Sequence, residues 1–209
     1  MNTLKALVVK ATVATACLGC SALAHSNLIY NGGFEDPNIS SGWTHVQDSA
    51  NGWQGDHIEV WVDGFLGVES PEGRQHGELN SHGARHGDAW SIFQTFDTTQ
   101  GSLYDFGFSY RARKNDSEAF RFQIYDSFNT SLIDLDVNDH VVGEWEHYSG
   151  SFWGTGNSTT LRLTAVQPTQ WTVGNLVDDV YVNAVPAPPA ALLMLSGLVG
   201  FGFVRRLRG

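Results

Sequence analysis

The sequence predicts an all-β fold, a single β-sandwich that lies between two terminal segments of different character. Glycine and Asn, Asp or Ser turn residues recur along the middle of the chain, between short runs of aromatic and β-branched residues. Nowhere do apolar residues repeat at helical spacing for three turns. This combination is typical of sandwiches built from many short strands.

The expected strands follow from these runs. Alternation is clearest in residues 103–113, where Tyr104, Phe106, Phe108 and Tyr110 share one face. Because side chains alternate across a strand, this aromatic face should be core, and the opposite, polar face should be exposed or line a groove. The strands predicted in chain order are Asn27–Tyr30, Ile58–Val62, Glu78–Asn80, Trp90–Phe96, Leu103–Arg113, Ala119–Asp126, Glu146–Trp153, Thr159–Ala165 and Leu176–Asn183.

The chain has 209 residues, and both ends look like processing signals. About 160 residues remain, which suits one domain with a single core. Five of the 12 basic residues and none of the 22 acidic residues lie in the two ends, so the domain carries a formal charge of −15. We therefore expect no nucleic-acid partner, because a polyanion binder needs a basic face. Both cysteines, Cys17 and Cys20, lie in the first segment, so disulfides do not stabilise the domain.

Residues 1–24 are predicted to be a secretory signal peptide. Lys5 and Lys10 give a basic start, residues 11–18 are small and apolar, and residues 22–24 supply the Ala-Leu-Ala pattern that signal peptidase requires. Cleavage after residue 24 leaves a β-sandwich domain at residues 25–184. The alternatives are a membrane anchor, for which the apolar run is short, and lipidation at Cys20.

Residues 185–209 form the second signal. Val185-Pro186-Ala187-Pro188-Pro189 precedes 15 uncharged residues, 190–204, and then Arg205-Arg206-Leu207-Arg208. Counted from Val185, the uncharged segment reaches the roughly 20 residues that a transmembrane helix needs, with the arginines in the cytoplasm.

This layout resembles the PEP-CTERM sorting signal of exopolysaccharide-producing Gram-negative bacteria, a Pro-Glu-Pro motif followed by an apolar helix and a basic end. Val185, Pro186, Pro188, Arg205 and Arg206 match that signal, and alanine stands where its glutamate is usual. The resemblance implies an exosortase-type transpeptidase as partner. The protein would cross the inner membrane, be held transiently by its C-terminal helix and then reach the cell surface or the outside. The alternative is an uncleaved single-span anchor.

The domain carries four motifs in order. These are Asn27-Leu28-Ile29-Tyr30-Asn31-Gly32-Gly33-Phe34-Glu35 with Gly42-Trp43, then Glu78-Leu79-Asn80, then Ile92 to Phe96 leading to Gly101-Ser102-Leu103-Tyr104 and Phe108 to Arg113, and finally Leu176-Val177-Asp178-Asp179-Val180. Together they resemble galactose-binding-like jelly rolls, among them carbohydrate-binding modules, domain of unknown function 642 and the choice-of-anchor group. The resemblance covers residues 27–183. It implies a single jelly-roll β-sandwich of two antiparallel sheets with adjacent chain ends, and it names no ligand.

The resemblance also implies a structural calcium site. In such modules a carboxylate from the first strand region and one from the last, with backbone carbonyls, bind Ca²⁺, which prefers several hard oxygens. Glu35 and Asp178 are the matching residues, with Asn31, Asp36 and Asp179 nearby. The alternative is that both carboxylates cap turns or face water.

All seven tryptophans lie in the domain. Trp43 and Trp90 fall in family-like positions and are expected in the core. The others neighbour polar residues, and flat indoles beside polar groups suit sugar rings. The predicted carbohydrate-binding residues are Trp53, Trp61, Trp145, Trp153, Trp171 and Arg111. The alternative is that these indoles are sandwich core, which we expect for at least three of the five.

Other chemistry has weaker support. His76, His82 and His86 lie in a glycine-rich insert that suits a solvated loop better than a closed metal signature. Glu144 and Glu146 would suit a glycoside hydrolase only across a defined cleft, and the domain lacks a Gly-x-Ser-x-Gly elbow, a phosphate loop and a cysteine nucleophile. The prediction is an exported, non-catalytic surface or extracellular-matrix protein that binds polysaccharide. The alternative is a structural or interaction protein of a biofilm without a sugar site.

Overall fold

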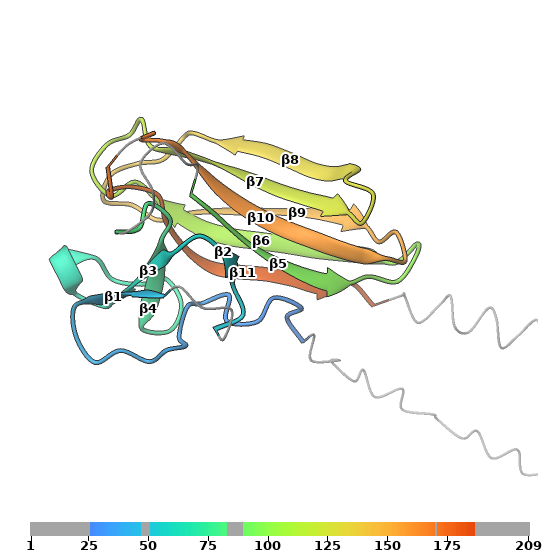
Figure 1. Ribbon diagram of the computed structural model, residues 1–209, viewed down its shortest axis with the longest axis horizontal. Coiled ribbons are helices and arrows are strands. Elements are labelled where there is room, and N and C mark those ends of the chain that lie inside the picture. Colours follow the sequence, from blue (N-terminus) through green and yellow to red (C-terminus); the bar gives the residue numbers. More distant parts are fainter. Residues whose placement is uncertain (1–25, 47–50, 83–89, 170, 187–209) are drawn as a thin grey trace, which may run out of the picture.

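The computed structural model describes residues 26–46, 51–82, 90–169 and 171–186 (Figure 1). They form two antiparallel sheets packed face to face, which confirms the predicted all-β sandwich. The six-stranded sheet has the order β1 (Trp43–Val46), β3 (Ile58–Val62), β4 (Gln75–Glu78), β11 (Leu176–Ala184), β6 (Leu103–Arg111), β9 (Glu146–Trp153). The five-stranded sheet has the order β2 (Gln54–Gly55), β5 (Ser91–Asp97), β10 (Ser158–Gln167), β7 (Ala119–Asp126), β8 (Ser131–Val137).

Within these ranges the chain has no α-helix, only a 3₁₀ turn at Phe65–Gly67, so no helix there is long and apolar enough to cross a membrane. The predicted signal peptide and C-terminal helix lie outside the described residues, as do His86, Pro188, Arg205 and Arg206.

Seven strands lie where the sequence predicts them, and Glu78–Asn80 only overlaps β4. The prediction of a strand at Asn27–Tyr30 is wrong, because the Asn27 side chain makes the hydrogen bonds to β11 that the backbone of a paired strand would make. Its Oδ1 atom accepts from Val182 N at 3.0 Å and its Nδ2 atom donates to Val180 O at 3.0 Å. The two-residue β2 and the edge strands β1 and β8 were not predicted. Each has a single strand partner, so each pairs along one side only.

The core lies between the sheets and follows the alternation of β6. Phe106 and Phe108 are buried and stack on Phe122 of the opposite sheet, with ring centroids 5.1 and 4.5 Å apart. Leu161 and Leu163 of β10 are buried beside them. Burial of such rings supplies most of the favourable free energy of folding, and parallel offset pairs add about 0.5–1.5 kcal/mol each.

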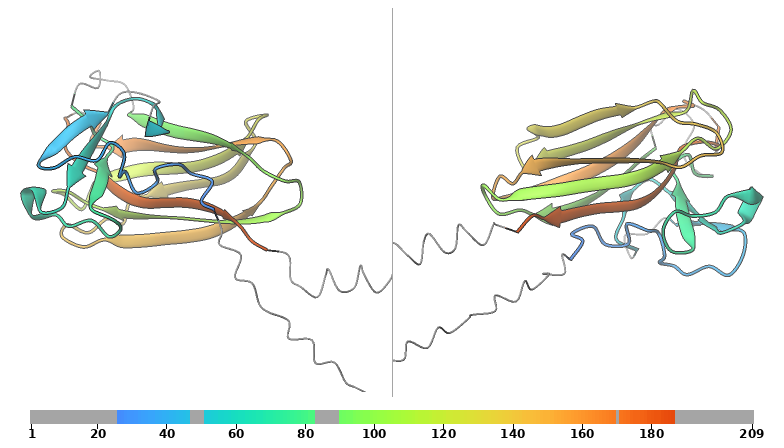
Figure 2. Two further views of the ribbon diagram at one scale, coloured as in Figure 1. Left: turned by 90° about the horizontal axis from the view of Figure 1, so that it is seen from below. Right: turned by 180° about the vertical axis from the view of Figure 1, so that it is seen from behind.

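The first and last described segments meet at β11. Leu28 N donates to Val182 O at 2.8 Å, and Val180 N donates to Gly32 O at 3.0 Å. Figure 2 shows both described ends of the chain leaving the sandwich on the same side. The ends are therefore adjacent, as the family resemblance implied.

A second apolar cluster covers part of the outer face of the six-stranded sheet. Trp61, Val68 and Leu176 are buried there, and Phe65 and Trp145 pack against them. The loop after β3 folds back over the sheet, and Trp145 Nε1 donates to Glu69 O at 2.8 Å. This cluster adjoins the end of the sandwich where β6 ends and β11 begins.

Candidate functional site

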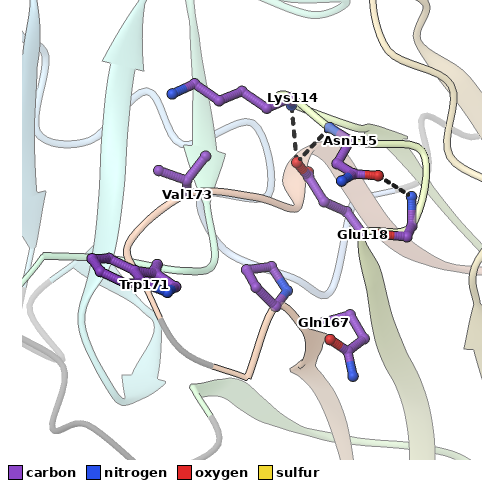
Figure 3. Close-up of a pocket in the computed structure, with 8 residues that line it drawn as sticks. Lys114, Asn115, Glu118, Gln167, Trp171 and Val173 are labelled. Carbon is purple, nitrogen blue, oxygen red and sulfur yellow. Dashed lines mark hydrogen bonds between the residues drawn. The ribbon is translucent and has the colours of Figure 1, made fainter.

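A pocket of about 310 Å³ lies at that end of the sandwich, between the loop after β6 and the loop after β10 (Figure 3). Trp171 lines it with a largely exposed indole, with 73% of its surface accessible. Pro168 and Val173 add apolar surface, and exposed polar groups surround it. The lining residues are Lys114, Asn115, Ser117, Glu118, Gln167, Pro168, Trp171 and Val173.

Glu118 holds the first loop in shape. It is 3% exposed. Its Oε1 atom accepts from the backbone N–H groups of Lys114 and Asn115, at 2.9 and 3.1 Å. Its Oε2 atom accepts from those of Arg113 and Asn175, at 2.8 and 2.9 Å. Because a single carboxylate ties both loops together, this side of the pocket is pre-formed.

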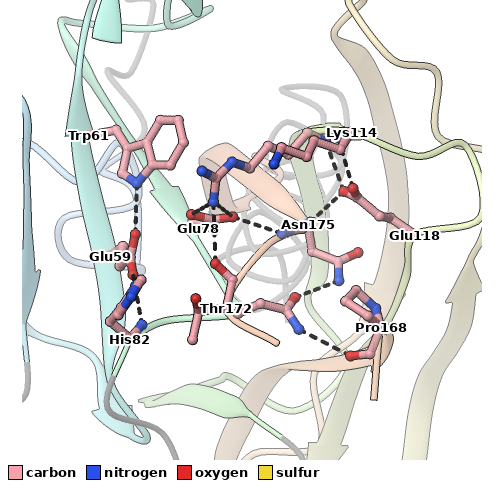
Figure 4. Close-up of polar contacts among 12 residues, drawn as sticks. Glu59, Trp61, Glu78, His82, Lys114, Glu118, Pro168, Thr172 and Asn175 are labelled. Atoms are coloured by element: carbon pink, nitrogen blue, oxygen red, sulfur yellow. Dashed lines mark hydrogen bonds and ion pairs between the residues drawn. The ribbon is translucent and has the colours of Figure 1, made fainter. Parts of the chain in front are cut away.

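Asn175 and Asn80 fix the second loop (Figure 4). Asn175 has a φ of 55°, in the left-handed region that Asn tolerates. Its Nδ2 atom donates to Asn80 Oδ1 and to Gln167 O, both at 2.8 Å. Asn80 Nδ2 donates in turn to Pro168 O at 3.2 Å. The floor of the pocket is therefore tied to the residues that follow β4.

A buried ion pair lies behind the pocket. Arg113 Nη1 donates to both oxygens of Glu78, at 2.8 and 3.0 Å, and Gly174 N donates to Glu78 Oε1 at 2.7 Å. The guanidinium of Arg113 also lies 4.4 Å from the centroid of the Trp61 ring, a cation–π contact. Burial raises the pKa of Glu78, against the opposite effects of Arg113 and the Gly174 N–H.

The predicted carbohydrate-binding residues do not converge. Trp53 and Trp61 are only 4% and 1% exposed, so neither can offer a ring face to a sugar, and their assignment is corrected. Trp145 is half-buried, so two of the five indoles are fully core rather than three. Trp171 lines the pocket, and Trp153, 64% exposed, ends β9 elsewhere.

Three further residues can be compared with the expectations from the sequence. Arg111 is half-buried at the end of β6, opposite Leu176, and is not among the pocket residues. Trp43 is 39% exposed on the edge strand β1, so the expectation that it is core is wrong. Trp90 is 3% exposed, as expected.

Sequence reasoning missed Lys114, Asn115 and Gln167. Lys114 is the single lysine between residues 25 and 184, in a polar turn directly after the strongest predicted strand. That position was the available signal, because binding residues gather on loops at strand ends. Nothing local in the sequence indicates that Gln167 lies beside this turn.

The outer face of the five-stranded sheet also carries aromatic rings. The Arg162 guanidinium lies 4.7 Å from the Phe93 ring centroid and 5.9 Å from that of Tyr125. Arg162 also donates to Tyr125 Oη at 3.1 Å and to Ser91 Oγ at 2.9 Å. These rings are therefore covered by a neighbouring side chain, unlike Trp171.

The residues expected to bind calcium lie in a polar cluster beside β11. Glu35 Oε1 accepts from Arg74 N and Gln75 N, the latter at 2.8 Å. Asp178 is 0% exposed, and burial raises its pKa to about 9, although it accepts the N–H groups of Asp179 and Glu72 at 2.8 and 3.3 Å.

Glu72 completes this cluster. A Cβ atom at Gly33 would touch Glu72 and lie 3.8 Å from Asp178 Oδ1, so these two carboxylates share the space beside Gly33. In the described part of the chain, no three His, Cys, Asp or Glu side chains are placed to hold one ion. The donors fit a hard cation such as Ca²⁺ only if backbone carbonyls supply the remaining ligands.

The histidines of the insert are separated. His76 is 0% exposed between the rings of Trp61 and Trp145, and its Nδ1 atom lies 2.9 Å from Ser70 Oγ. His82 is largely exposed and lies 2.9 Å from Glu59 Oε1. Both therefore have structural partners. Glu144 and Glu146 do not lie on one strand, because β9 begins only at Glu146.

No protein-family model and no curated protein matches this sequence. Among solved structures, the fold is similar to the carbohydrate-binding module TmCBM61, solved in complex with β-1,4-galactotriose, at 15% identity and a TM-score of 0.50 over 77% of this chain and 99% of that one. It is also similar to the enzymatically active domain of tailspike protein 4 from bacteriophage CBA120, at 15% identity and a TM-score of 0.49 over 76% and 21% of the two chains. A CBM4 structure aligns at 17% identity and a TM-score of 0.45 over 75% and 99%. At these identities the similarities show the fold alone.

Proposed function

We propose that this chain is an exported, non-catalytic protein of the cell surface or extracellular matrix that binds polysaccharide through the pocket at Trp171. The observation that carries the proposal is the 73% exposed indole of Trp171 at a pocket of about 310 Å³. An indole face packs against the C–H groups of a sugar ring, and surrounding amides and amines bond its hydroxyls. Lys114, Asn115 and Gln167 supply those groups.

Rigid loops support the same proposal. The four N–H groups held by Glu118 and the bonds of Asn175 order the pocket before any ligand arrives. A pre-formed site loses less conformational entropy on binding than one that must fold around its ligand. The fold similarity to TmCBM61 is consistent with a sugar as ligand, and β-1,4-galactotriose is a sensible first probe.

Export rests on the sequence. We propose that signal peptidase removes residues 1–24 and that an exosortase-type transpeptidase processes the tail. Val185 N donates to Leu103 O at 2.9 Å, so the sandwich holds the chain up to the start of the tail. Processing is therefore expected between Pro186 and Pro189. Mass spectrometry of the secreted protein tests this, and a mature form that retains residues 190–209 contradicts it.

A structural Ca²⁺ is part of the proposal. The support is that Glu72 lies near Glu35 on one side and near Asp178 on the other, together with the complete burial of Asp178. Backbone carbonyls would have to supply the further ligands. The ion would join the N-terminal segment to β11 and neutralise carboxylates that otherwise repel one another.

The sugar site is tested by binding to a glycan array and to insoluble polysaccharides, with β-1,4-galactotriose and β-1,4-galactan included. Trp171→Ala is expected to weaken binding at least tenfold with an unchanged melting temperature. Phe128→Ala is the matched control, because Phe128 is an equally exposed aromatic ring, at 77%, on the β7–β8 turn. Equal binding by Trp171→Ala and the unaltered protein contradicts the site, and absence of any glycan binding contradicts the function.

A further inference from the structure

The outward face of β11, β6 and β9 carries a second exposed aromatic surface, here called the Tyr181 face. The strand register places its residues in rows across the three strands. From the middle of the sheet toward the start of β6, the rows are Tyr181, Gly107 and Ser149, then Asn183, Asp105 and Ser151, then Val185, Leu103 and Trp153.

Tyr181 lies flat on the sheet because Gly107 leaves room for its ring. A Cβ atom at residue 107 would lie 2.5 Å from three atoms of the Tyr181 ring. His147 flanks the ring from β9, with an interplanar angle of 17° and ring centroids 6.2 Å apart. At that separation the two nearly parallel rings do not cover each other. Tyr181 is half-buried and His147 is exposed, so both rings present surface to solvent.

Several hydrogen-bonding groups beside the ring have no partner among the residues that the structure describes. In the described residues, no hydrogen bond is made by the side chains of Asp105, Asn183 or Ser151, or by the Tyr181 hydroxyl. A pocket of about 310 Å³ lies against them, lined by Asp105, Tyr181, Asn183, Ala184, Val185 and Pro186. This distinguishes the Tyr181 face from the outer face of the five-stranded sheet, where Arg162 occupies the rings and polar groups.

A second ring extends the surface. Trp153 is 64% exposed and lies opposite Leu103, four residues along β6 from Gly107. At about 3.4 Å per residue the two aromatic positions are about 14 Å apart along the strands, and about 10 Å apart across them because β11 and β9 lie on either side of β6, which gives about 17 Å in all. Only small or polar side chains separate them on β6 and β9. This spacing suits an extended chain of several sugar units rather than a single one.

We propose that the Tyr181 face is a second carbohydrate-binding surface, which takes a neutral glycan chain lying along β6 and β9. Anionic glycans are excluded because Asp105 and Asp179 are the charged groups beside the ring. The inference rests on the proposed function in one respect, that the chain binds polysaccharide. Tyr181 and Trp171 serve different ends of the sandwich, because the Trp171 pocket follows the end of β6 and the Tyr181 face adjoins its start.

Two separate sites make one chain bivalent. A bivalent binder links two polymer chains, and its avidity for a polymer exceeds the affinity of either site without any new contact. The protein would therefore cross-link a neutral polysaccharide matrix rather than only attach to it.

The test compares the full chain with Trp171→Ala, Tyr181→Ala and Trp153→Ala, and with the double variants Trp171→Ala/Tyr181→Ala and Trp171→Ala/Trp153→Ala. Affinity electrophoresis measures binding to soluble β-1,4-galactan and to each neutral polysaccharide that the unaltered protein binds. Cross-linking is measured as the turbidity of the same polymer. Tyr181→Phe keeps the ring and is the matched control. Trp153→Ala removes an exposed side chain, so it tests the face even if Tyr181→Ala fails to fold.

Trp171→Ala is expected to keep residual polymer binding, which Tyr181→Ala and Trp153→Ala lower at least tenfold in that background. Trp171→Ala and Tyr181→Ala should each abolish turbidity, because cross-linking needs both sites. Tyr181→Phe should retain the turbidity. Identical binding and turbidity in Trp171→Ala and the double variant, or loss of all binding in Trp171→Ala, overturns the second surface but leaves the Trp171 pocket standing. If Tyr181→Ala or Trp153→Ala lowers polymer binding and Trp171→Ala does not, the Trp171 pocket is overturned instead. Stronger retention by a uronic-acid polymer than by neutral ones overturns the neutral ligand class.

Discussion

Arg113 Nη1 donates to both carboxylate oxygens of Glu78, at 2.8 and 3.0 Å, although Glu78 is 0% exposed. The pair joins the end of β4 to the loop that carries Lys114. Gly174 N donates to the same carboxylate, so the second pocket loop is anchored there as well. This buried pair thus anchors both loops of the pocket that Trp171 lines.

Glu78→Ala should therefore destabilise the fold and the pocket together. Removing one partner of a buried pair leaves an uncompensated charge and typically costs about 3–5 kcal/mol. Urea denaturation gives the free energy of unfolding. Arg121→Ala is the matched control, because it breaks an exposed pair with Asp134 and should cost at most about 1 kcal/mol. Equal losses in the two variants contradict this account.

Glu118→Gln should weaken sugar binding and also destabilise the fold. Glutamine has one acceptor oxygen in place of two, so it cannot hold all four N–H groups that Glu118 accepts. Each hydrogen bond to a charged group contributes about 1.5–3 kcal/mol to the free energy of unfolding. Calorimetric titration with the glycan identified on the array measures the effect. Asp97→Asn, an exposed carboxylate at the end of β5, is the control and should bind normally.

The core could be predicted from the sequence because its pattern is local. The aromatic alternation of β6 and the aliphatic alternation of β10 each identify a buried face without knowledge of the partner strand. The strand β8 was missed although Ile133, Leu135 and Val137 alternate with acidic residues. Its acidic positions resemble a loop until Arg121 of β7 is known to pair with Asp134.

The site could not be predicted, because polar residues near a tryptophan do not reveal whether its ring is exposed. Trp61 lies between Val60 and Val62 with an acidic residue two positions away on each side, and Trp171 follows a glutamine. Trp61 is buried because two segments cover it. One is the Arg113 side chain, 52 residues further along the chain, and the other is the loop that directly follows β3. Trp171 has no such cover and lines the pocket. Exposure of a ring depends on distant segments, which composition and spacing do not reveal.

Calcium should stabilise the fold if Glu35 and Asp178 hold it. A ligand that binds only the folded state raises the free energy of unfolding, by about 2.7 kcal/mol at a concentration 100 times its Kd. Melting curves with calcium and with a chelator measure this. Glu35→Gln should abolish the difference, whereas Asp97→Asn should leave it intact. An unchanged midpoint in the unaltered protein contradicts the site.

His76 should favour unfolding in mild acid, whereas Glu78 and Asp178, whose pKa values burial raises, act in the opposite direction. Burial lowers the pKa of His76 to about 4, with Asp63 raising it and Arg111 lowering it further. In the unfolded chain a histidine has a pKa of about 6.5. Between these values the unfolded state binds a proton that the folded state does not, so acid favours unfolding.

The contribution of His76 is complete above pH 6.5 and is lost as pH falls toward 4, at about 1.4 kcal/mol per pH unit and about 3 kcal/mol in all. Burial also lowers the pKa of His140, which adds a change of the same sign. Urea denaturation from pH 4 to 7 gives the slope. His76→Gln fills the site with a group that does not titrate, so between pH 7 and 4 its free energy of unfolding should lose about 3 kcal/mol less than that of the unaltered protein. The effects of His140, Glu78 and Asp178 are common to both proteins. Identical slopes would show that His76 accepts its proton as readily in the folded state as in the unfolded one.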